Sequence, residues 1–241
     1  MSVHFEGIRN SYRSLKRVIR ALGGHDFLQR RQMACETKWL GNVDARWCVC
    51  PSTLHGSSVV YSFGVGEDIS FDLELIQNFG MQVHAFDPTP RSIEWLQRQD
   101  LPQRFVFHAY GVADFDGTCK FHAPANPKHI SHTLIERHAK QPSIQVPVNR
   151  LTSIMKTLGH DRIDLLKMDI EGAEYGVLED LLRSRIAVKQ FLVEFHHRWP
   201  EIGVAKTKQA IRALNDAGFR IFSVSSKGEE YSFLNLAIKA P

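Results

Sequence analysis

The sequence lacks the features that mark membrane-spanning, secreted and repetitive proteins. No apolar run approaches the roughly 20 residues that a spanning helix needs, and no apolar core follows the basic start, so we expect no signal peptide. Internal repeats and low-complexity tracts are also absent, which excludes solenoid and collagen-like architectures. We therefore expect a soluble, cytoplasmic protein, and its 241 residues suffice for one large α/β domain.

Cysteine is scarce, with only Cys35, Cys48, Cys50 and Cys119. Cys48 and Cys50 have no second pair of ligand residues, whereas structural zinc sites usually combine two such pairs. A disulfide such as Cys35–Cys50 is one alternative to free thiols. The composition favours reduced, buried thiols.

Acidic residues are rare in the first part of the chain. Residues 1–40 hold eight Lys or Arg against three Asp or Glu, and a basic helix is expected at 8–22. Such a basic helix is compatible with binding to nucleic acid or a membrane. Because the run of basic residues is short and has no interleaved aromatics, a solvated helix face is favoured. A second helix is expected near 26–38, so residues 1–57 are predicted to form an N-terminal helical extension.

From residue 58 to 241 the pattern changes to one domain of alternating strands and helices. Near-continuous apolar runs separated by helical spacing predict a doubly wound, mostly parallel sheet. The last two runs flank a Lys-Gly turn and predict an antiparallel terminal hairpin. The expected strands lie within 58–66, 81–88, 104–112, 163–170, 189–197, 219–226 and 231–240.

The first strand ends in SFGVGEDIS, which is not a dinucleotide-binding motif because Ile69 stands at the third glycine position. Gly64 and Gly66 would still allow a ligand to approach the backbone closely. Negative charge at Glu67 and Asp68 repels a pyrophosphate but suits an amine or a sulfonium. The turn therefore predicts a ligand with little or no phosphate.

Asp87 ends the second strand, where an acid is suited to the two hydroxyls of a ribose. Alternatively, it caps the next helix through its Asp-Pro-Thr turn. Taken with the glycine turn, Asp87 favours a nucleoside, and S-adenosylmethionine has the required groups. We expect cofactor contacts from Phe63, Gly64, Gly66, Glu67, Asp68, Ser70, Asp87, Thr89, Gly111 and Val112.

Three blocks, SFGVGEDISFD, HAFDPTP and LLKMDIEGAEYGVLEDLL, resemble the FkbM-type S-adenosylmethionine-dependent methyltransferases. The resemblance covers roughly 58–240 and is strongest at KMDIEGAE. It implies a Rossmann-like, seven-stranded methyltransferase sheet and methyl transfer to oxygen, often a hydroxyl of a sugar or polyketide. The first block departs from the commoner family form, which has an Asp and an Asn where this chain has Ser62 or Phe63 and Glu67, and resembles a methyltransferase-like subgroup.

Acids and histidines follow the fourth and fifth expected strands. A sugar hydroxyl has a very high pKa, so methyl transfer to it needs a base or a metal. In one alternative, a divalent cation such as Mg²⁺ or Mn²⁺ binds Asp169, Glu194 and His196. In the other, His196 or Asp169 is the general base, and acids such as Glu171 orient hydroxyls. Both alternatives stay open at this point.

Neighbouring polar residues receive lesser roles. Glu174 is interpreted as a helix start that favours the helix dipole. Strand alternation predicts that His196 and His197 face opposite ways, with Glu194 on the side of His196. The histidine-rich stretch 122–138 is a candidate cover for the acceptor, with contacts from Ser131, His132 and Thr133.

The prediction for the whole chain is an S-adenosylmethionine-dependent O-methyltransferase acting on a hydroxyl of a sugar, glycan or other small molecule. One alternative is a nucleic-acid methyltransferase that docks through the basic helix, although the Asn/Asp-Pro-Pro-aromatic motif of amino-methylating enzymes is absent. The other is a non-catalytic S-adenosylmethionine-binding module. The sequence does not indicate the oligomeric state.

Overall fold

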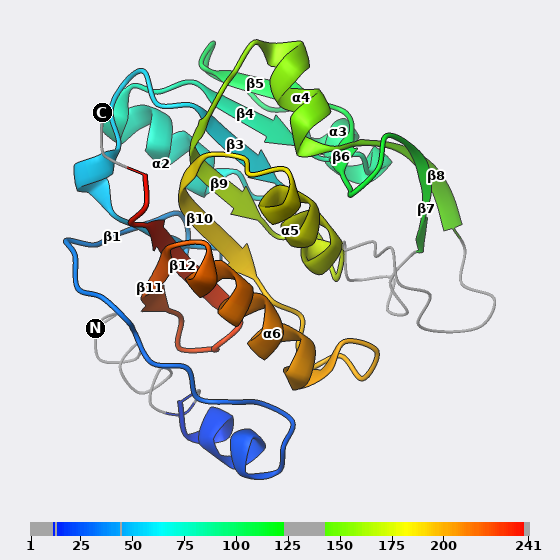
Figure 1. Ribbon diagram of the computed structural model, residues 1–241. Coiled ribbons are helices and arrows are strands. Elements are labelled where there is room, and N and C mark those ends of the chain that lie inside the picture. Colours follow the sequence, from blue (N-terminus) through cyan, green and yellow to red (C-terminus); the bar gives the residue numbers. More distant parts are fainter. Residues whose placement is uncertain (1–11, 13, 44, 123–142, 239–241) are drawn as a thin grey trace.

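A computed structural model describes residues 12, 14–43, 45–122 and 143–238 (Figure 1). A seven-stranded sheet with the order β11-β12-β10-β9-β3-β4-β5 forms its centre, and every strand of this sheet except β12 runs in the same direction. The predicted sheet and its terminal hairpin are therefore confirmed. The strands are β3 (Val60–Phe63), β4 (Val83–Phe86), β5 (Phe105–His108), β9 (Ile163–Met168), β10 (Val188–Glu194), β11 (Phe219–Val224) and β12 (Glu230–Asn235).

Helices cover both faces of the sheet, which explains why its central strands are continuous apolar runs. Strand alternation sends Tyr61 to one face and Val60 to the other, into separate core clusters. The Tyr61 face packs against α4 (Leu151–Leu158), α5 (Glu174–Arg183) and α6 (Gly203–Asp216). The opposite face packs against α2 (Ser70–Phe79) and α3 (Pro90–Leu96).

The order of the strands reverses between β3 and β9. From β3 the chain adds β4 and β5 on one side, and from β9 it adds β10 and the terminal hairpin on the other. Ligands of doubly wound sheets bind beyond the carboxyl ends of the strands at such a reversal. The ends of β3 and β9 are therefore where this fold is expected to bind a ligand.

A second, three-stranded sheet has the order β6-β8-β7. The prediction of one strand over 104–112 is wrong at its end, because the chain leaves the main sheet after His108 and Gly111 pairs with Val148 of the small sheet. Its strands are β6 (Gly111–Val112), β7 (Gly117–His122) and β8 (Ser143–Asn149).

Residues 14–22 are helical, in agreement with the basic helix expected there, but the second helix predicted near 26–38 is wrong. The chain instead runs extended beside β11, where the N–H groups of Gln32 and Met33 both donate to the carbonyl of Ile221 (2.7 and 3.1 Å). The free edge of β11 thus replaces a helix as hydrogen-bond partner. The predicted domain boundary after residue 57 stays a prediction.

A short two-stranded sheet and a 3₁₀ turn complete this segment. They are β1 (Lys38–Leu40), β2 (Trp47–Val49) and η1 (Pro51–Thr53).

All four cysteines are free, so the disulfide alternative is not realised. Within the described residues, no helix combines the length and the apolar character that crossing a membrane requires.

Candidate functional site

A cavity of about 500 Å³ lies at the carboxyl edge of the main sheet. Of the ten predicted cofactor contacts, nine line it; Ser70 does not, because its hydroxyl instead accepts a hydrogen bond from the N–H of Asn42 (2.8 Å). The N-terminal segment closes one side through Arg46 and Trp47. The predicted contacts in its wall are Phe63, Gly64, Gly66, Glu67, Asp68, Asp87, Thr89, Gly111 and Val112.

The glycine turn after β3 brings that strand against the end of β9. The N–H of Asp169 donates to the carbonyl of Phe63 (3.2 Å), and a Cβ on Gly64 would lie 1.7 Å from the carbonyl oxygen of Asp169. Gly66 also has a positive φ, of 57°, but a Cβ there would meet nothing within 4 Å. Gly64 is therefore needed for close packing, whereas Gly66 leaves open space beside the cavity.

Asp87 ties the glycine turn to the end of β4. Its Oδ2 accepts from the N–H of Gly66 (3.0 Å), and its Oδ1 accepts from the N–H and the hydroxyl of Thr89 (2.9 and 2.6 Å). The helix-start alternative is thus realised in part. Because each carboxylate oxygen can accept two hydrogen bonds, Oδ2 keeps one acceptor position for a ribose hydroxyl.

The two acids after the turn differ in their surroundings. Glu67 receives two parallel hydrogen bonds from Arg91 (2.9 and 3.0 Å), so its charge is offset. Asp68 accepts from Ser70 and from the amide of Asn42 (2.9 and 3.1 Å). Although burial acts in the other direction, these hydrogen bonds lower the pKa of Asp68, which keeps it ionised at the cavity wall.

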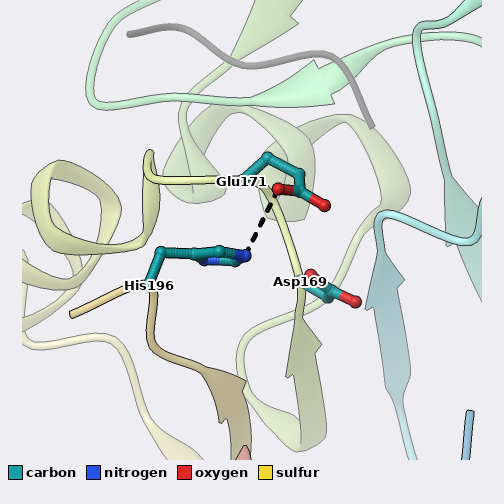
Figure 2. A group of neighbouring side chains, drawn as sticks. All are labelled: Asp169, Glu171 and His196. Carbon is teal, nitrogen blue, oxygen red and sulfur yellow. Dashed lines mark ion pairs between the residues drawn. The ribbon is translucent and has the colours of Figure 1, made fainter. Parts of the chain in front are cut away.

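Two carboxylates flank His196 beyond the ends of β9 and β10. The ring Nε2 lies 3.3 Å from Oε2 of Glu171, the ion pair drawn in Figure 2. Its Nδ1 lies 3.1 Å from Oε1 of Glu174 without the alignment of a hydrogen bond. Asp169 stands beside this pair at the cavity. As strand alternation predicts, His197 turns to a different partner, Asp26 (3.0 Å).

Glu174 has more contacts at this candidate site than its position at the start of a helix predicted. It does begin α5, but its side chain is fully buried and its carboxylate accepts from the N–H groups of Ile170 and Gly172 (3.0 Å each). It thereby holds a turn in which Glu171 has the left-handed φ of 54°, which is uncommon outside glycine. A second acid three positions after Glu171, with a glycine between, was the available signal.

The charges at this site shift the pKa values of His196 and Asp169. Burial alone would lower the pKa of His196, but Glu174 and Glu171 outweigh it and raise that pKa well above its usual range. Burial raises the pKa of Asp169 to about 6, with Lys167 opposing and Glu171 adding to the rise. At neutral pH the site therefore holds a cationic imidazole beside a carboxylate of increased basicity.

The contact between Glu171 and His196 can be tested by titration. In a Glu171→Gln variant we expect the His196 pKa to fall, because a neutral amide replaces one of its two flanking charges. NMR titration of the imidazole protons measures this shift, and Glu179→Gln, on the exposed side of α5, is the matched control. An unchanged His196 pKa in Glu171→Gln would contradict the described contact.

The predicted metal ligands do not gather as expected. Asp169, Glu171 and His196 bring one ligand atom each within 4.8 Å of one another, whereas Glu194 lies outside this group in the cavity wall. Metal binding needs a neutral ring nitrogen, whereas Glu174 and Glu171 raise the pKa of His196 well above its usual range. The predicted set with Glu194 is therefore not assembled, and a cation would have to displace the proton that these carboxylates stabilise.

Two buried charged residues at the cavity were not predicted as site residues. Lys167 donates to the carbonyls of Phe63 and Gly64 (3.1 and 2.7 Å) and lies 5.6 Å from the ring centre of Trp47. Asp72 of α2 is buried, and its Oδ1 has no hydrogen-bond partner among the described residues. The predicted acceptor contacts Ser131, His132 and Thr133 lie outside the described residues.

Comparison of the sequence with known proteins identifies a matching family. The model of the Methyltransferase FkbM domain matches residues 58–221. "Probable methyltransferase-like protein 24" is similar over 194 residues in Rattus norvegicus (29% identity, 76% of this chain, 47% of the relative) and over 195 residues in Homo sapiens (28%, 76% and 47%). The chain thus spans about half the length of these curated relatives.

Among solved structures, fibrillarin from Aeropyrum pernix, determined with bound S-adenosyl-L-methionine, is similar with a TM-score of 0.42 and 11% identity, over 75% of this chain and 66% of that one. Methanococcus jannaschii fibrillarin, a pre-rRNA processing protein, has a TM-score of 0.44 and 11% identity, over 82% and 81%. The family model covers more than half of the sequence and spans both the glycine turn and the Asp169 cluster. The chain belongs to the FkbM methyltransferase family.

Proposed function

We propose that this protein is an S-adenosylmethionine-dependent O-methyltransferase that acts on a hydroxyl of a glycan or another small molecule. The observation that carries the proposal is the shared cavity: the glycine turn, Asp87 and Asp169 meet where the strand order reverses. When bound there, S-adenosylmethionine would supply an electrophilic methyl group on a cationic sulfur. Family membership supports this cofactor.

Several residues of the cavity suit particular parts of such a cofactor. The open space at Gly66 admits it against the backbone, and the free acceptor position of Asp87 suits a ribose hydroxyl. The ionised Asp68 suits its amine. The open, charged wall beside Asp169 is left for the acceptor.

Asp169 is the group we assign as general base. S-adenosylmethionine bound here would supply the methyl group to the acceptor oxygen and keep the electrons of the broken carbon–sulfur bond, and Asp169 would accept the hydroxyl proton. A pKa of about 6 makes this carboxylate more basic than an ordinary aspartate while leaving it mostly ionised at neutral pH. His196, held as a cation, cannot accept that proton, so we assign it and Glu171 to positioning. This arrangement is favoured over the metal-assisted alternative.

The charge of the cavity wall bears on the acceptor class. Carboxylates outnumber the cationic side chains Arg46 and Lys167, so a phosphate-bearing acceptor would be repelled. This disfavours a nucleic-acid substrate and favours a neutral or cationic one. Free cysteines agree with the proposed cytoplasmic location. The acids of the wall are Glu67, Asp68, Asp72, Asp87, Asp169, Glu171, Glu194 and Glu230.

Calorimetry with S-adenosylhomocysteine tests the cofactor site. We expect the full chain to bind it with a Kd in the micromolar range, and Asp87→Asn to weaken binding about tenfold or more. An amide at position 87 would set its NH₂ group against the N–H of Gly66 or of Thr89. Asp100→Asn, at an exposed surface position, is the matched control. Absence of binding by protein with an intact circular dichroism spectrum would refute the proposal.

A further inference from the structure

The helix at residues 14–22 turns an apolar face toward solvent. Leu15, Ile19 and Leu22 are 60%, 62% and 85% exposed, and their spacing places them on one side of the helix with Tyr12. Soluble domains usually bury such a stripe. We call these four residues the docking face.

The opposite side of this helix contacts the rest of the protein through Arg17. Arg17 is mostly buried, donates to the carbonyl of Phe27 (3.1 Å) and lies 3.9 Å from the buried carboxylate of Asp26. Asp26 in turn receives two hydrogen bonds from Arg198 (3.0 and 2.6 Å). The outward direction of the docking face is therefore set by a buried ionic network that links the helix to the end of β10.

Positive charge surrounds the docking face. No acid occurs between residues 7 and 25, and Lys16 and Arg20 form an adjacent row one turn apart. The helix is drawn in blue near α6 in Figure 1. A groove of about 540 Å³ lies beside it and is lined by Leu22 and Leu28. The exposed cations Lys208 and Arg212 of α6 also line this groove. Apolar and cationic groups thus occupy one continuous surface.

We propose that this surface docks the protein onto an anionic lipid bilayer, with the docking face in the interface and the basic residues at the headgroups. Amphipathic helices with apolar and Lys/Arg-rich sides bind membranes in this way. A second copy of the chain would bring like charges together, and a nucleic acid would leave Leu15, Ile19 and Leu22 in water. The inference does not depend on the proposed methyl transfer.

Vesicle co-sedimentation of the full chain tests this inference. We expect binding to vesicles of equal parts phosphatidylcholine and phosphatidylserine, and little binding to phosphatidylcholine alone. Replacing the exposed Leu15, Ile19 and Leu22 with serine should weaken binding to the mixed vesicles roughly hundredfold. Lys16→Gln and Arg212→Gln should each weaken it about fivefold.

The matched control replaces the exposed apolar residues Val43 and Leu236, which lie outside this surface, with serine and should bind vesicles like the wild type. Unchanged circular dichroism and thermal unfolding would show that each variant is folded. Equal sedimentation with both kinds of vesicle, or full binding by the triple serine variant, would overturn the proposal. Self-association or salt-sensitive RNA binding that requires the same three residues, without vesicle binding, would also overturn it.

Discussion

Replacing Gly64 with alanine is expected to destabilise the protein by several kcal/mol and to abolish cofactor binding. The added Cβ would lie 1.7 Å from the carbonyl oxygen of Asp169, and Gly64 has a φ of 75°, which strains any other residue. Since the contact is with backbone, no side-chain rotation relieves it, and β3 and β9 must separate. Urea unfolding measures the loss, which we expect to be at least about 3 kcal/mol.

Alanine variants of two other glycines distinguish the effect of this steric clash from the effect of backbone strain alone. Gly80, at the end of α2, has a φ of 67°, and Gly66 has one of 57°; a Cβ meets nothing within 4 Å at either. Alanine at each should cost only about 1 kcal/mol of stability. Gly80→Ala should still bind S-adenosylhomocysteine, whereas Gly66→Ala should lose binding, because its Cβ enters the proposed cofactor space. If Gly64→Ala is as stable as Gly80→Ala, the described packing is wrong.

Replacing Asp169 with asparagine is expected to abolish methyl transfer while making the protein more stable. Loss of the proposed general base should lower the rate by about a hundredfold to ten-thousandfold. Because burial raises the pKa of Asp169 to about 6, the folded state binds a proton more tightly than the unfolded state, and stability falls as pH rises between about 4 and 6. Asparagine removes this loss, so the gain should be about 1 to 3 kcal/mol at pH 7 and vanish near pH 4.

Glu194→Gln distinguishes the general-base assignment from the metal alternative. Burial, with repulsion from Asp169, also raises the pKa of Glu194 well above its usual range, so this variant should gain stability at neutral pH as well. In the proposed mechanism Glu194 takes no proton, and we expect its rate to stay within about tenfold of the wild type. A loss as large as that of Asp169→Asn, restored by added Mg²⁺ or Mn²⁺, would favour the predicted metal site instead.

The main sheet could be predicted from sequence because its strands are buried on both faces. The run from Ile163 to Met168 is buried at every position, and such continuous runs between amphipathic helices define a parallel sheet locally. The same pattern of strands predicted that the acids at the ends of β9 and β10 lie at the carboxyl edge of the sheet. The glycine turn after β3 was predictable because glycines at the end of a strand mark a tight turn or a close backbone approach, which Gly64 makes to Asp169.

The errors arose where distant residues decide the local structure. A second helix was expected near 26–38, but Asp26 pairs with Arg198, and Gln32 pairs with Ile221. Because these hydrogen-bond partners lie far away in the sequence, they produce no periodic pattern of apolar residues within the segment itself. Likewise, Glu174 has the position of an ordinary helix start, and its contact with His196 depends on how β9 and β10 end side by side.

The most direct test of the proposed function is transfer of a labelled methyl group from S-adenosylmethionine to a panel of glycans and small alcohols. The full chain should label at least one neutral hydroxyl acceptor and no phosphorylated one. Asp169→Asn, shown to be folded and to bind S-adenosylhomocysteine, should label none. Equal labelling by wild type and Asp169→Asn, or labelling confined to phosphate-bearing acceptors, would contradict the assignment of this cavity.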